Sequence, residues 1–214
     1  DIEDNQMKNY YLQEFEDLLA SDKRIKDRFE ILFDLSKSIV LKTNHRITDK
    51  AEAQLLLKNI LNRADTEFVY SFMAMSFLAE LLMEEFKAFK YNEVLGDLLD
   101  LINKLADLGK KRKIYPLLIR SLILQANLFL INCELEKGEN SFDKAISLAK
   151  EKKLIILLKQ AELQKQLFID QIGEWQKLID RNSLFTDRIE LTKIDDYLRD
   201  LQKIIIDKPK TEDK

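Results

Sequence analysis

Residues 122–154 read LILQANLFLINCELEKGENSFDKAISLAKEKKL, and the organisation of the whole chain can be worked out from them. Apolar residues recur at helical spacing on both sides of a polar point at Asn132–Cys133, which predicts two helices joined by a tight turn. Small residues stand at Ala126, Gly138 and Ala145, where short side chains let two helices approach closely. The stretch therefore predicts an antiparallel helical hairpin.

Gly138 lies in the local sequence EKGEN, which by itself is typical of a turn. The spacing of the small residues instead places Gly138 inside the second helix, facing Ala126 at the point where the helices cross. Glycine there lowers helix propensity by roughly 1 kcal/mol relative to alanine, and close packing would offset that loss. The alternative is that Gly138 simply interrupts the helix.

This spacing resembles the tetratricopeptide (TPR) repeat, which has small residues at its eighth, twentieth and twenty-seventh positions. In that alignment Leu122, Phe129 and Phe142 take the fourth, eleventh and twenty-fourth positions, and the clearest repeat covers residues 114–154. The preceding hairpin aligns with Leu105–Ala106 on Leu148–Ala149. The resemblance implies an all-α fold, an α-solenoid of stacked antiparallel helix hairpins that winds into a TPR-like superhelix. A general α-solenoid outside that family is the alternative.

The composition agrees with an all-α chain. The 214 residues include only 4 glycines and 2 prolines, while 46% are hydrophobic and 34% charged. We expect about nine helices within a single domain over residues 1–208 and a disordered charged tail over residues 209–214. The expected helices are residues 2–19, 24–42, 48–62, 65–89, 93–108, two in the central hairpin, 154–180 and 188–206. Thr48 or Asp49 is the expected cap of the third helix, and Gly109 the expected end of the fifth.

Charge and cysteine content exclude several classes of protein. A formal net charge of −3 argues against binding to nucleic acid or to an anionic membrane surface. The single cysteine, Cys133, rules out an intrachain disulfide. No apolar run approaches the roughly 20 residues of a membrane span, and no secretory signal is visible, so the cytoplasm is the default compartment. Because the first residue is Asp1 rather than Met, we expect a piece of a longer chain.

The residues that carry catalysis do not form a recognisable set. The only histidine, His45, falls in a polar connection, and the four glycines are too scattered for a phosphate-binding loop. Adjacent acids such as Glu84–Glu85 and Asp195–Asp196 point to different sides of a helix. The basic run at residues 110–113 is predicted to be a solvated connection. The sequence therefore predicts no catalytic residues, no cofactor and no metal site, and indicates a protein that is not an enzyme.

The family resemblance implies where a partner binds. First helices of such repeats line a concave groove that receives peptides or helices of other proteins. In this sequence the alignment places six residues of the central repeat in that groove: Arg120, Ile123, Leu124, Asn127, Leu130 and Ile131. The first hypothesis is a non-enzymatic protein–protein interaction module, a scaffold or adaptor that binds a protein or peptide partner. The alternative is a regulatory or sensor domain of a larger signalling protein, binding a small ligand or its own attached effector domain.

The sequence does not decide what occupies this groove. A partner helix could lie in it through anchors at i, i+3 and i+4. An element of the same chain, either residues 2–19 or residues 188–206, could instead fold over it as a cap. The apolar residues could also be buried as ordinary core by tight winding, and self-association is a further option.

Overall fold

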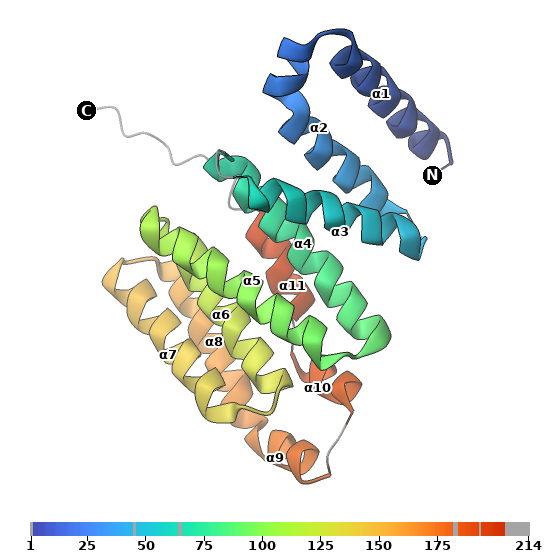
Figure 1. Ribbon diagram of the computed structural model, residues 1–214. Helices are drawn as coiled ribbons and strands as arrows, with labels where there is room; N and C mark the ends of the chain where they lie inside the picture. Colours follow the sequence, from blue (N-terminus) through green and yellow to red (C-terminus); the bar gives the residue numbers. More distant parts are fainter. Residues whose placement is uncertain (1, 45, 64–65, 182–183, 193, 204–214) are drawn as a thin grey trace, which may run out of the picture. The chain divides into compact units, whose positions relative to one another are not determined.

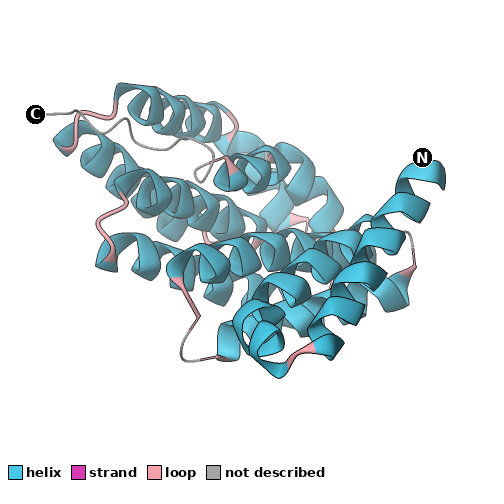
Figure 2. Cartoon of the chain, turned by 90° about the horizontal axis from the view of Figure 1, so that it is seen from above, coloured by secondary structure: helices cyan, strands magenta, loops and turns pink. Residues whose placement is uncertain are grey.

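The computed structural model describes residues 2–44, 46–63, 66–181, 184–192 and 194–203. Over these ranges the chain forms eleven α-helices and no strand, which confirms the all-α class (Figure 2). The helices are α1 (Ile2–Ser21), α2 (Lys23–Thr43), α3 (Ile47–Asn62), α4 (Phe68–Phe89), α5 (Asn92–Lys111), α6 (Tyr115–Ile131), α7 (Leu135–Glu151), α8 (Ile155–Asp170), α9 (Ile172–Asp180), α10 (Phe185–Leu191) and α11 (Ile194–Gln202).

The expected number of about nine helices was too low because two long helical patterns are each interrupted. The pattern over residues 154–180 breaks at Gln171, which has φ −97° and ψ 4° and separates α8 from α9. The last pattern breaks after Leu191, where Thr192 is extended. The Thr192 hydroxyl donates to the Ile189 carbonyl at 2.9 Å, a local side-chain bond that competes with continuation of the helix.

Two expected helix ends are also wrong. Helix α3 begins after Arg46, so Thr48 and Asp49 lie inside its first turn rather than capping it. Asp49 accepts a hydrogen bond from the Asn44 side chain at 2.8 Å, which occupies the carboxylate that was expected to cap. Helix α5 continues past Gly109 to Lys111. Pro116 is the second residue of α6, in the first turn, where its missing N–H leaves no helical hydrogen bond unmade.

The chain divides into two compact units, Asp1–Leu81 and Leu82–Lys214, with the boundary inside α4. In the first unit α1 packs on α2 and α2 packs on α3. The rings of Phe15 and Phe33 meet edge to face with centroids 5.4 Å apart, and α3 buries Leu57 completely. The single domain expected over residues 1–208 stays a prediction, and the tail at residues 209–214 lies outside the described residues.

In the second unit, helices that follow one another in sequence pack on one another, from α5 through α6 and α7 to α8 (Figure 1). The three turns between them are alike. Lys113, Cys133 and Lys153, twenty residues apart, each adopt a left-handed backbone with φ of 57°, 62° and 56°. In each turn the next amide donates to the carbonyl five residues back, as in a Schellman helix end. This regularity aligns Gly109 with Ala149, which replaces the alignment of Ala106 with Ala149.

Two glycines of this unit lie where helices touch. A Cβ at Gly138, in α7, would stand 2.8 Å from the Leu130 side chain and 3.2 Å from the Ala126 carbonyl oxygen. Gly138 is therefore helical and faces Ala126, as the sequence predicted. A Cβ at Gly109 would stand 2.9 Å from the backbone nitrogen of Leu118 in α6, whereas one at Gly96 would meet nothing within 4 Å.

These three glycines give the first testable prediction. Gly96→Ala should raise the free energy of unfolding by roughly 0.5–1 kcal/mol, because it adds helix propensity in open space. Gly109→Ala should lower it by about 1–3 kcal/mol, because the opposing atom is backbone. Gly138→Ala should fall between them, since the Leu130 side chain can rotate, while Gly138→Leu should lose about 1–3 kcal/mol. Urea denaturation followed by circular dichroism measures all four, and equal shifts for Gly96→Ala and Gly109→Ala would contradict the packing.

Candidate functional site

Helix α6 is the central helix of the second unit. Its seventeen residues, YPLLIRSLILQANLFLI, contain a single charged side chain, Arg120, and ten of them are buried. A helix that is apolar nearly all round must be surrounded by neighbours. The chain provides them, since α6 contacts α5, α7, α8, α10 and α11.

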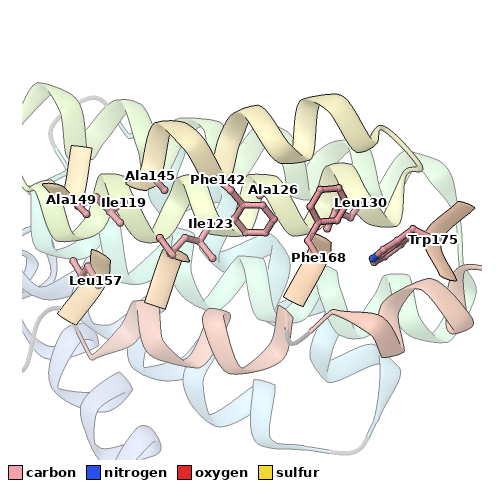
Figure 3. Close-up of a cluster of buried hydrophobic side chains, with 11 residues drawn as sticks. Ile119, Ile123, Ala126, Leu130, Phe142, Ala145, Ala149, Leu157, Phe168 and Trp175 are labelled. Atoms are coloured by element: carbon pink, nitrogen blue, oxygen red, sulfur yellow. The ribbon is translucent and has the colours of Figure 1, made fainter. Parts of the chain in front are cut away.

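The six residues predicted to line a groove all lie on α6, but they are not an open surface. Five of them are at most 2% exposed, and Arg120 is half-buried: the five are Ile123, Leu124, Asn127, Leu130 and Ile131. Ile123 and Leu130 belong to a core cluster that also contains Phe142 of α7 and Phe168 of α8 (Figure 3). A partner could therefore reach this face only by displacing elements of the chain itself.

The chain's own last helices, α10 and α11, cover part of α6. One guanidinium nitrogen of Arg120 donates to the backbone carbonyl of Asp200, in α11, at 2.7 Å. From the other side, Arg188 of α10 donates to the backbone carbonyl of Ile131 at 3.3 Å. The structure thus realises two alternatives that the sequence left open. The C-terminal segment folds over α6, and Ile123 and Leu130 are also buried as core against α7 and α8.

Helix α11 lies on α6 as an amphipathic helix. Ile194, Leu198 and Leu201 repeat at i, i+4 and i+7, and each is at most 2% exposed. Asp195 and Asp196 are exposed beside this apolar face. Asp195 also pairs with Lys87 near the end of α4, so an ion pair supplements the apolar contact.

Arg188 holds α10 in place, and sequence reasoning missed it. Its side chain is 8% exposed, and its guanidinium lies over the Phe185 ring, 5.1 Å from the centroid. The Phe185 ring in turn meets Phe86 edge to face, with centroids 5.1 Å apart. The sequence does contain a signal for this role, since Arg188 falls on the same helical face as Phe185 and Ile189. An arginine within an apolar stripe needs a buried hydrogen-bond acceptor.

Tyr197 joins α11 to α8. Burial raises the pKa of its hydroxyl to about 12, a hydrogen bond with the Gln164 side chain opposes this rise, and the nearby carboxylates of Asp200 and Asp196 add to it. Tyr197 is therefore neutral at physiological pH. Because the pKa is raised above its ordinary value of 10.0, the associated stability is present below that pH and is lost as pH rises toward 12.

A pocket of about 140 Å³ lies beside these contacts, lined by residues of α6 to α10. Trp175 of α9 forms part of its wall and is 1% exposed. No described residue accepts a hydrogen bond from its indole nitrogen. Asn127, Gln164 and Glu190 add polar groups to the lining.

Chemical groups elsewhere in the described residues do not converge. No three His, Cys, Asp or Glu side chains within the described ranges are arranged to hold a metal ion. Cys133 is half-buried in the α6–α7 turn, and His45 lies outside the described residues. Among the helices that the structure describes, none combines the length and the apolar composition that crossing a bilayer requires.

No protein-family model, curated protein or solved structure matches this chain. The resemblance of residues 114–154 to the TPR pattern therefore depends on the spacing of the small residues.

The anchoring role of Arg188 yields a direct prediction. Arg188→Ala removes the donor to the Ile131 carbonyl and the stacking on Phe185, so it should lower the free energy of unfolding by about 1–3 kcal/mol. Arg199→Ala is the matched control on α11, because Arg199 is exposed and pairs with Asp196 one turn away on the same helix. That change should stay within about 0.5 kcal/mol of the parent protein. Thermal unfolding by circular dichroism measures both, and equal effects would show that Arg188 does not anchor α10.

Proposed function

We propose that this chain is a non-enzymatic protein–protein interaction module, a scaffold or adaptor that receives an amphipathic helix on α6. The observation that carries the proposal is α11 itself. A helix with apolar residues at i, i+4 and i+7 already lies on this face, with Ile194, Leu198 and Leu201 buried. Amphipathic helices of partner proteins bind apolar surfaces through the same spacing of anchors.

The finer architecture is part of the same proposal. A TPR-like α-solenoid is supported by the recurrence of one turn geometry at Lys113, Cys133 and Lys153 and by the sequential packing of α5 to α8. Helical hairpins stacked in this way form a concave binding surface. The groove positions on α6 (Arg120, Ile123, Leu124, Asn127, Leu130 and Ile131) remain the proposed partner-binding residues.

The contacts of α11 indicate the chemistry of a suitable partner. Its acidic residue Asp195 pairs with Lys87, and the Arg120 guanidinium binds a backbone carbonyl of the docked helix. A partner helix with one apolar stripe and flanking carboxylates would reproduce these contacts. Because α11 is tethered, it competes at an effective concentration of the order of millimolar, so a partner must bind tightly enough to displace it.

A regulatory or sensor domain is the second candidate function. The specific observation in its favour is the pocket of about 140 Å³, whose wall includes an indole nitrogen without a described acceptor. A small molecule in that pocket would touch both the repeat helices and α10. Such a ligand would couple its own presence to the position of the C-terminal segment.

Binding of the chain's own C-terminal segment supplied as a separate peptide tests the helix-receiving role. The full chain with Leu198→Asp and Leu201→Asp should release α11, because charges do not stay in an apolar contact without partners. This variant should bind a fluorescent peptide of residues 184–203 at least ten-fold more tightly than the parent chain does, measured by fluorescence anisotropy. A peptide carrying the same two changes is the matched control and should not bind.

The variant must first be shown to be helical by circular dichroism, and Leu198→Ala serves as a milder replacement if the double variant unfolds. A folded variant that gives no binding to the parent peptide would contradict the proposal. Equal binding of the parent and control peptides would also contradict it, because the apolar stripe would then have no role.

A further inference from the structure

The pocket beside α6 contains a buried hydrogen-bond donor for which no described residue is an acceptor. The Trp175 indole is 1% exposed, and no described residue accepts a hydrogen bond from its nitrogen. In Figure 3 the nitrogen end of this ring points toward Phe168, which lines the same pocket. A buried N–H without an acceptor costs about 1–3 kcal/mol, so an acceptor that enters the pocket would recover that loss.

The walls of the pocket favour a flat apolar body. Phe142 and Phe168 both line it, with ring centroids 6.3 Å apart and planes tilted by 34°. The volume of about 140 Å³ is close to that of an engineered protein cavity of about 150 Å³ that binds benzene. A single six-membered ring with one small substituent therefore matches the space.

The polar groups in the lining select the charge of a ligand. No basic side chain is among the described residues that line the pocket, whereas Glu190 contributes a carboxylate and is exposed. The Asn127 side-chain nitrogen donates to the Ile123 carbonyl at 2.8 Å, which leaves its amide oxygen as an acceptor. The amide groups of the lining both donate and accept, whereas its one charged group is a carboxylate, so the lining disfavours an anion.

We infer that this pocket is a binding site for a small, neutral or cationic aromatic molecule. Its ring lies against Phe142 and Phe168, its carbonyl or other acceptor takes the Trp175 N–H, and its own N–H groups face Asn127 or Glu190. The pocket shares Asn127 and Leu130 with the proposed groove on α6. It is tested by a different ligand, so failure of the helix-binding proposal would leave this inference standing.

The ligand would also touch α10. Glu190 and Leu191 belong to that helix and line the pocket together with α8 and α9 residues. A bound molecule would therefore link α10 to the repeat helices and hold the C-terminal segment in place. Occupancy of the pocket would in this way regulate the helix-binding site on α6.

Benzamide and benzoate are matched probes, because they share the ring and the planar substituent and differ in charge and in N–H donors. Trp175 is the only tryptophan of the chain, so the full protein has a single indole N–H signal in a proton–nitrogen NMR spectrum. Benzamide should shift this signal saturably, with a dissociation constant in the millimolar range or below, as expected for a ligand of about nine non-hydrogen atoms. Benzoate should bind at least ten-fold more weakly.

Two variants locate the binding. Leu167→Phe fills the pocket from α8 and should abolish the shift, whereas Leu163→Phe on the same helix is exposed and should leave it unchanged. Trp175→Phe removes the donor and keeps an aromatic ring, so benzamide affinity, followed by saturation-transfer NMR, should fall roughly five- to ten-fold.

The inference is overturned by an indole signal that benzamide does not move, which would mean that the pocket holds water only. An equal shift in Leu167→Phe would place the ligand elsewhere, and unchanged affinity in a folded Trp175→Phe variant would remove the donor. Benzoate binding as tightly as benzamide would overturn the charge selection.

Discussion

The desolvation of α6 is the constraint on which the second unit depends. Arg120 is the only charged residue of α6, so this helix stabilises the fold only when neighbouring helices bury its apolar side chains. Helices α5, α7 and α8 cover part of α6, and the C-terminal helices α10 and α11 contact it as well. The same apolar surface that suits a partner helix is thus what keeps the C-terminal segment on the repeat.

The helix ends make this arrangement possible. Three turns with the same left-handed geometry connect α5 to α8, which are nearly equal in length, and each turn makes consecutive helices antiparallel. The left-handed residues are lysine or cysteine rather than glycine, so each turn stores some backbone strain that helix packing must offset. The regular spacing brings Gly109 and Gly138 to the helix contacts, where even a methyl group would crowd a neighbour.

The sequence predicted the local pattern better than the ends of helices and the long-range contacts. Apolar periodicity and few breakers were enough for the all-α class, and the spacing of Ala126 and Gly138 was enough for the central hairpin. The sequence placed a connection at residues 110–113, but the left-handed geometry at Lys113 and Lys153 was not recognisable, because lysine gives no signal for a left-handed backbone. The breaks at Gln171 and Thr192 and the anchor at Arg188 depend on tertiary contacts, which a periodic pattern does not contain.

Amide hydrogen exchange measured by mass spectrometry tests most directly whether α11 is a docked helix on α6. The account predicts that residues 194–203 exchange more slowly than an unstructured peptide of the same sequence and faster than α6. Displacement of α11 would open one face of α6 without unfolding the repeat. Exchange of residues 194–203 at the rate of the unstructured peptide would contradict the account, because α11 would then not be docked on α6.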